Sequence, residues 1–68
     1  GMTLASVSRM LERMYNVDVV FSDSSVAGYT YTGLIRNSSL MNVLELISGT
    51  SPVKYRMNGN TIKFYMND

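Results

Sequence analysis

The chain has 68 residues, 46% of them hydrophobic, with a formal net charge of +1 and neither His nor Cys. This length makes one domain. The missing Cys excludes disulfides, and a zinc site would have carboxylates alone. The near-neutral charge gives no broad footprint for nucleic acid, and no apolar run reaches the roughly 20 residues that span a bilayer. Gly1 before Met2 is interpreted as a protease remnant, so residues 3–67 are expected to form the domain.

The first predicted element is a helix that begins after Thr3, whose hydroxyl suits an N-cap. Asn16 is expected to end it, because Asn tolerates the left-handed conformation of a C-terminal cap. Its apolar stripe comprises Leu4, Val7, Met10, Leu11 and Met14. Residues 17–21 alternate in polarity and predict a strand. Residues 29–35 are rich in aromatic and β-branched side chains and predict a second strand.

A second helix is expected to begin at the serine pair 38–39 and to end at Gly49, with Pro52 preventing its continuation. Its main apolar face consists of Leu40, Val43, Leu44 and Ile47. Met41 and Leu46 lie about 110° to either side of that face at 100° per residue. An apolar arc of this width predicts a helix that is covered on more than one side.

The dipeptide Asn58-Gly59 lies between two alternating runs and predicts a β-hairpin with a type I′ loop. The expected cross-strand pairs are Met57 with Asn60, Tyr55 with Ile62, and Val53 with Phe64. In this register one face carries Val53, Tyr55, Ile62 and Phe64, and the other carries Lys54, Arg56, Lys63 and Tyr65. Lys54 and Lys63 would lie directly opposite each other, which costs a little stability.

A helix-strand pattern occurs twice, with Thr3-Leu4-x-x-Val7 matching Ser39-Leu40-x-x-Val43 at an offset of 36 positions that persists into the following strands. The chain is therefore predicted to be an α+β domain of order α-β-β-α-β-β. Two antiparallel strand pairs would flank two helices in a pseudo-twofold arrangement. The expected core consists of Val7, Leu11, Val19, Phe21, Tyr31, Leu40, Val43, Leu44, Ile47, Tyr55, Ile62 and Phe64.

The polar residues do not form a catalytic pattern. Glu12 and Glu45 fall on predicted solvent faces and Asp18 points off the core, so no carboxylates are paired for acid–base chemistry. No His is present to activate a Ser, and Gly28 and Gly33 lack the spacing of a phosphate loop. We expect no enzymatic activity and no cofactor. A small hydrolase or ligand-binding domain is the rival class.

With no catalytic pattern in the sequence, protein binding is the expected function. The first candidate surface for it is a strand edge. A domain with few strands leaves edges that can accept a partner strand. Residues 29–34 are preferred over the hairpin strand 61–66, with Tyr29, Thr30 and Thr32 as contact residues. The alternative role of this segment is that of a core strand through Tyr31.

The second candidate surface is the basic face formed by Lys54, Arg56 and Lys63. It is either a solvated sheet face or a docking face for an acidic partner, where its charge would act mainly on the rate of association.

Three stretches of the chain resemble a known family. They are LERMYNVDVVF (residues 11–21), YTGLIRNSSL (31–40) continuing to VLELI (43–47), and KYRMNGNTI (54–62). Together they resemble the C-terminal domain of FecR-type anti-sigma factors from Bacteroidetes-like bacteria, over the whole chain after Met2. The domain is similar to the short N-terminal domain of secretins and TonB-dependent transporters. That version begins with an extra strand, for which Met2-Thr3 leave no room, and this favours the anti-sigma family.

The resemblance implies the periplasmic domain of a single-pass inner-membrane protein that has a cytoplasmic sigma-binding segment. Its implied partner is the periplasmic signalling domain of an outer-membrane transporter, whose signal it would relay to a sigma factor. Binding of nucleic acid is not implied, membrane contact comes through the parent protein alone, and homo-oligomerisation stays open. The signalling domain of a transporter or secretin is the alternative. The family supplies no active-site residues to this sequence.

Overall fold

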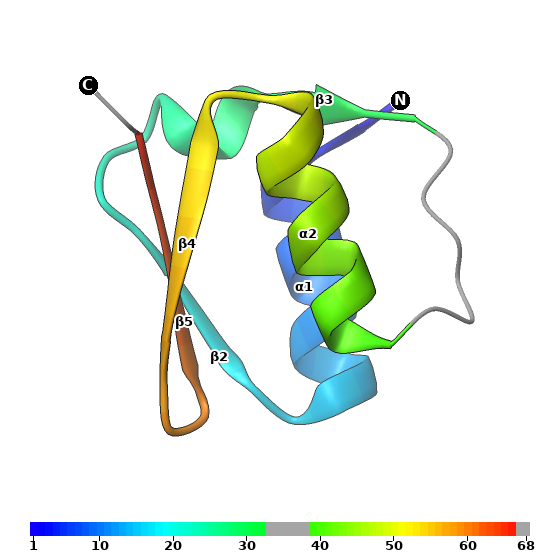
Figure 1. The fold of residues 1–68 in the computed structure, drawn as a ribbon, viewed down its shortest axis with the longest axis vertical. Coiled ribbons are helices and arrows are strands. Elements are labelled where there is room, and N and C mark those ends of the chain that lie inside the picture. The colour runs from blue at the N-terminus through cyan, green and yellow to red at the C-terminus, as the bar shows by residue number, and fades with distance from the viewer. Residues whose placement is uncertain (33–38, 67–68) are drawn as a thin grey trace.

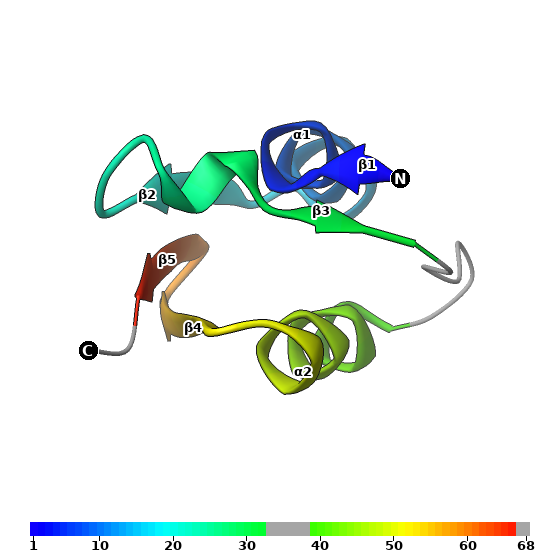
Figure 2. The same ribbon diagram turned by 90° about the horizontal axis from the view of Figure 1, so that it is seen from above.

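A computed structural model describes residues 1–32 and 39–66 of the chain. The elements are β1 (Met2–Thr3), α1 (Leu4–Tyr15), β2 (Asp18–Phe21), the 3₁₀ turn η1 (Val26–Gly28), β3 (Thr30–Tyr31), α2 (Leu40–Thr50), β4 (Val53–Asn58) and β5 (Thr61–Met66). Both helices lie on one side of a three-stranded sheet, as Figures 1 and 2 show from two directions. The predicted α+β class is confirmed.

Helix α1 begins and ends where the sequence predicts. The Thr3 hydroxyl accepts a hydrogen bond from the Ser6 amide at 3.2 Å, and Asn16 adopts the left-handed conformation with φ 55° and ψ 49°. Glu12, predicted to face solvent, is instead half-buried, and its carboxylate accepts a 3.0 Å hydrogen bond from the Val19 amide. The helix therefore holds the start of β2 through a side chain that the amphipathic pattern assigned to the polar face.

The sheet has the strand order β2-β5-β4, and β2 runs parallel to β5. The predicted arrangement of two antiparallel strand pairs is therefore wrong. β4 and β5 do form the antiparallel hairpin, but β2 pairs with β5, and β3 pairs with β1. Hydrogen bonds from the Asp18 amide to the Asn60 carbonyl (2.8 Å) and from the Ser22 amide to the Phe64 carbonyl (2.9 Å) extend the parallel ladder at both ends.

The strand β1 corrects a second expectation, that no strand precedes the first helix. Met2 pairs with Tyr31 and Thr3 with Thr30 in an antiparallel ladder. The Leu4 amide continues it with a 2.7 Å hydrogen bond to the Tyr29 carbonyl. Two residues suffice for this strand because Thr3 is extended, with φ −72° and ψ 158°, while it also caps α1.

The hairpin forms as predicted, but its register differs. Asn58 pairs with Thr61, so the loop is Gly59-Asn60 and not Asn58-Gly59. Gly59 has a φ of +60°, whereas Asn58 stays in the strand. A two-residue loop with Gly at its first position is a standard hairpin solution. The change moves each cross-strand partner by two residues, which leaves the predicted apolar and basic faces of the hairpin intact.

Helix α2 starts after Ser39, whose hydroxyl accepts a hydrogen bond from the Asn42 amide at 3.3 Å. Gly49 does not end it. The helix continues to Thr50 because the hydroxyls of Thr50 and Ser51 each donate a 2.7 Å hydrogen bond to a carbonyl four residues earlier. Such bonds satisfy carbonyls that a helix end leaves without a partner. Pro52 follows directly.

The expected enclosure of α2 is also wrong. Met41 is 50% exposed and Leu46 is 36% exposed, so the helix buries one face only. In Figure 2 the sheet lies beside α2 and α1 lies above it, and no described element covers the other sides of this helix.

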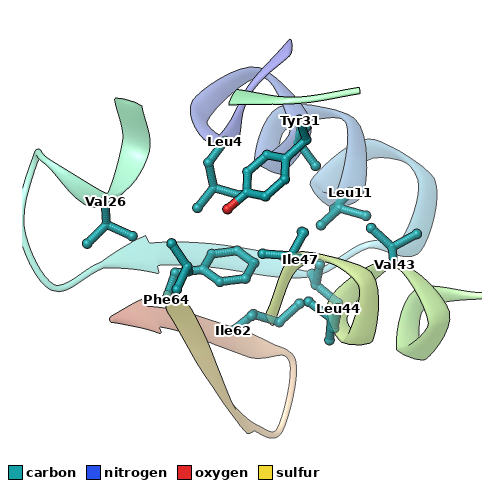
Figure 3. Packing of buried hydrophobic residues seen from close by; sticks show 12 residues of the cluster. Leu4, Leu11, Val26, Tyr31, Val43, Leu44, Ile47, Ile62 and Phe64 are labelled. Carbon is teal, nitrogen blue, oxygen red and sulfur yellow. The ribbon is translucent and has the colours of Figure 1, made fainter. Parts of the chain in front are cut away.

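The core lies between the helices and the sheet (Figure 3). Eight predicted core residues are buried: Val7, Leu11, Tyr31, Val43, Leu44, Ile47, Ile62 and Phe64. Four are only partly buried, namely Val19, Phe21, Leu40 and Tyr55, and four buried residues were not in the predicted core, namely Leu4, Val17, Val26 and Val53. Met14, assigned to the apolar stripe, is 50% exposed in the last turn of α1.

The 36-position offset is present in the placement of the helices. α1 begins at Leu4 after the cap Thr3, and α2 begins at Leu40 after the cap Ser39. The pairs Val7 and Val43, and Val17 and Val53, are buried at equivalent positions. The pseudo-twofold arrangement in space stays a prediction.

The loop between β2 and η1 is shaped by Asp23. Its Oδ1 accepts hydrogen bonds from the Ser25 amide (2.9 Å) and the Ser25 hydroxyl, and its carbonyl accepts one from the Val26 amide (3.3 Å). The side-chain and backbone hydrogen bonds from Ser25 lower the pKa of Asp23. This turn directs Val26, which is fully buried, into the core.

Leu44→Ala should reduce the free energy of unfolding by about 2–5 kcal/mol, because Leu44 is fully buried and the smaller side chain leaves a cavity. Met41→Ala on the exposed side of the same helix should change it by less than about 0.5 kcal/mol. Urea unfolding followed by circular dichroism measures both. Equal losses in the two variants would contradict the assigned core.

Asp23→Asn should destabilise the domain at neutral pH more than at acidic pH. Since the folded pKa of Asp23 is lowered, its ionised form contributes stability above the unfolded value of about 3.9, and this contribution is lost as the pH falls through the folded pKa. The difference in urea midpoint between wild type and Asp23→Asn should therefore shrink from pH 6 to pH 3. Asp18→Asn is the exposed-carboxylate control. If the difference in urea midpoint between wild type and Asp23→Asn does not change with pH, the charge of Asp23 does not contribute to stability.

Candidate docking surfaces

The strand β3 keeps one edge free of other strands within residues 1–32 and 39–66. Its one partner strand is β1. The Leu4 amide bonds to the Tyr29 carbonyl, so this carbonyl faces β1. Backbone groups alternate in direction along an antiparallel strand. The amide and carbonyl of Thr30 therefore face away from β1.

The sequence-predicted contact residues of this strand take different positions. Thr30 and Thr32 are exposed, whereas Tyr29 is half-buried and packs against the core. Tyr31 is buried, as the alternative role required. Residues 33–35 of the predicted strand lie outside the described residues. Thr30 and Thr32 thus present the accessible part of this edge.

Helix α2 contributes to the same surface, which the sequence did not suggest. A hollow of about 220 Å³ is lined by Thr30, Tyr31, Thr32, Leu46 and Thr50. Leu46 supplies an exposed apolar side chain next to the strand. The sequence feature that could have revealed this surface is the wide apolar arc of α2. It was interpreted as a helix side covered by other elements, whereas in the structure that side is accessible.

The relative position of β3 and α2 is fixed by a hydrogen-bond chain. The Ser51 hydroxyl donates to the Ile47 carbonyl at 2.7 Å and accepts a hydrogen bond from the Val53 amide at 3.3 Å. The Tyr31 hydroxyl lies 2.9 Å from the same oxygen. Because the Ser51 proton is used on Ile47, Tyr31 is the donor in this contact. Figure 3 shows the Tyr31 ring entering the core from the β3 side.

The basic face lies on the side of the sheet that the helices do not cover. Arg56 and Lys63 are exposed and directly opposite each other, whereas Lys54 is half-buried opposite Tyr65. The predicted opposition of Lys54 and Lys63 is therefore wrong, owing to the changed register. Arg56, Lys63 and Tyr65 line a hollow of about 220 Å³. On β2, Val20 is 45% exposed beside Lys63.

The two candidate surfaces are separate. β3 belongs to the two-stranded sheet, and the basic residues belong to the three-stranded sheet. β3 lies near the start of α1, whereas the basic face points away from both helices (Figures 1 and 2).

Tyr55 and Glu45 link α2 to β4 on the helix side. The Tyr55 hydroxyl donates a 3.1 Å hydrogen bond to the Glu45 carboxylate. Partial burial, together with the hydrogen bond and charge of Glu45, raises the pKa of Tyr55. The protonated hydroxyl of Tyr55 is thus a donor that ties β4 to α2. Within the described ranges, no three Asp or Glu residues cluster to hold a metal ion.

The fold and these surfaces define a small α+β domain whose accessible features are a strand edge, an apolar helix side and a basic sheet face. The FecR C-terminal family matches residues 1–64, and the chain belongs to that family. It is thus a FecR-type signalling domain. No curated protein and no solved structure matched the chain. Neither helix in the described part of the chain is long and apolar enough to cross a membrane.

Tyr31→Phe should lower the free energy of unfolding by about 0.5–1.5 kcal/mol, because it removes the hydrogen bond to Ser51 and keeps the buried ring. Tyr29→Phe, two residues earlier on the same segment, should leave stability nearly unchanged. Chemical denaturation of both variants compares the two hydroxyl groups. Equal effects would show that the Tyr31–Ser51 contact does not stabilise the packing of β3 on α2.

Proposed function

We propose that this domain is the periplasmic interaction module of an anti-sigma factor anchored by a single helix in the inner membrane. It receives a signal from the periplasmic domain of an outer-membrane TonB-dependent transporter and passes it toward a sigma factor, and it acts through binding and not through catalysis. The observation that carries this proposal is the family match over residues 1–64. FecR proteins are membrane-anchored regulators with a periplasmic C-terminal region.

The partner docks by adding a strand to β3. The outward backbone groups of Thr30 supply hydrogen bonds, and those of Thr32 join them as the added strand extends the pairing past Tyr31. The hollow beside Leu46 and Thr50 receives a side chain of the incoming strand. Alternate side chains of an added strand point to the same face, so one in two would reach this hollow. Exposed threonines suit such an edge, since they favour strands without presenting large apolar side chains.

Thr32→Pro should weaken binding of the transporter's periplasmic domain, because proline removes the backbone amide on the free edge. Thr32→Ala keeps this amide and should bind nearly as tightly as wild type. Titration calorimetry against a panel of periplasmic signalling domains from transporters of the same organism measures both. If the proline variant is folded and binds as tightly as the alanine variant, strand addition at β3 is refuted.

The alternative parent is a transporter or secretin that carries this domain at its N-terminus. The presence of β1 removes the argument that a missing first strand separates the two classes. The family match favours the anti-sigma parent. The sequence of the complete reading frame decides: one membrane-spanning helix before this domain supports the proposal, whereas an outer-membrane pore domain after it refutes the proposal.

A further inference from the structure

The basic face of the three-stranded sheet carries an uncompensated charge pair. Arg56 on β4 and Lys63 on β5 are directly opposite in the antiparallel register. Like charges in this position are destabilising. Neither side chain forms an ion pair within residues 1–32 and 39–66. The Arg56–Lys63 pair therefore does not stabilise the fold.

The charge is concentrated on this face. Three of the six Lys and Arg residues of the chain, Lys54, Arg56 and Lys63, lie on it. Asp18, the carboxylate that shares this face among the described residues, lies in the row of Thr61 and Asn58. It is thus displaced from the Arg56–Lys63 row toward the hairpin loop. Half of the Lys and Arg residues of a nearly neutral chain thus lie on one sheet face, where Arg56 and Lys63 are exposed and Lys54 is half-buried.

The surface between these cations is partly apolar and hollowed. Tyr65 lines the hollow with Arg56 and Lys63, and Val20 is exposed beside Lys63. A bound chain can cover this exposed Val20 side chain. Tyr and Arg are both enriched at protein–protein interfaces.

The spacing of the cations fits an extended chain. Lys54 and Arg56 are two residues apart on β4, which separates them by roughly 7 Å along the strand. Side chains at positions i and i+2 of an extended peptide repeat at the same distance. Two carboxylates on one face of such a peptide can therefore meet Lys54 and the Arg56–Lys63 pair in register.

We propose that this face binds an extended acidic protein segment with carboxylates at alternate positions, in a site independent of the β3 edge. Arg56 and Lys63 share one carboxylate, and Lys54 meets the next. Tyr65, opposite Lys54, packs against the bound chain, and Val20 flanks the site on the β2 side of Lys63. The bound carboxylate relieves the repulsion between Arg56 and Lys63. The proposal does not depend on strand addition at β3, and either site can exist without the other.

The test uses the 68-residue chain labelled with ¹⁵N and a capped peptide Thr-Glu-Val-Glu-Val-Glu-Thr, with a Gln-for-Glu peptide as the matched control. The Glu peptide should shift the amide signals of Arg56, Lys63 and Tyr65, and its affinity should fall as salt is raised. The Gln peptide should not bind. Equal binding of both peptides, or no shift with either, overturns the proposal.

Arg56→Thr and Lys63→Thr should each weaken binding of the Glu peptide by about threefold, the effect of losing an exposed ion pair. Threonine favours strands, so the urea midpoint of each variant should be unchanged or raised. Arg9→Gln removes a charge from exposed α1 and should leave binding unchanged. Undiminished binding to the two threonine variants, or equal weakening in Arg9→Gln, refutes the site.

Inorganic phosphate and vesicles of phosphatidylglycerol are the controls that distinguish binding of an acidic peptide from binding of other anions. Neither should shift the same signals at the concentrations at which the Glu peptide binds. If vesicles bind through Arg56 and Lys63 while the peptide does not, the face is a membrane-contact surface and the proposal is wrong.

Discussion

The parallel ladder between β2 and β5 is the interaction on which the rest of the fold depends. It joins Asp18–Phe21 to positions 43 residues later in the chain, from Thr61 to Phe64. The rings of Phe21 and Phe64 stack with centroids 6.1 Å apart on its helix-facing side. Without this pairing, the helix-strand unit at the start of the chain and the helix-hairpin unit at its end would each expose an apolar face. With it, both units share one core.

The ladder also decides which surfaces are accessible. Because β5 is enclosed between β2 and β4, the edges of the larger sheet belong to those two strands. This overturns the expectation that 61–66 is an outer strand. Alternation then directs Ile62 and Phe64 to the core and Lys63 and Tyr65 to the other face. The smaller sheet remains apart, held to α2 by Tyr31 and Ser51.

Local chemistry explains which features could be predicted. Features that depend on residues close together in the sequence could be predicted. They are the helix caps Thr3, Asn16 and Ser39, the apolar faces of the helices and the two faces of the hairpin. The parallel pairing of β2 depends on contacts between distant segments, which no local pattern encodes. The hairpin register depended on whether Asn58 or Gly59 opens the loop, since both tolerate turns.

The candidate surfaces divide in the same way. Alternation alone placed Thr30 and Thr32 off the core and grouped Lys54, Arg56 and Lys63. The position of Leu46 beside β3 could not be predicted without knowing how α2 packs. A wide apolar arc on a helix is compatible with a covered side and with an accessible one. Glu12 was assigned to solvent for a similar reason: its bond to the Val19 amide depends on the angle at which the chain leaves α1.

The placement of β1 has a mechanical consequence. None of residues 1–17 belongs to the three-stranded sheet, and the chain before α1 is held by two residue pairs with β3 and the bond from Leu4 to Tyr29. Tension applied at the N-terminus reaches this short ladder before it reaches the core. The ladder is therefore the weakest link along that line of force. Its rupture would free the Tyr29 carbonyl and the backbone groups of Tyr31, while the β2–β5–β4 sheet stays closed.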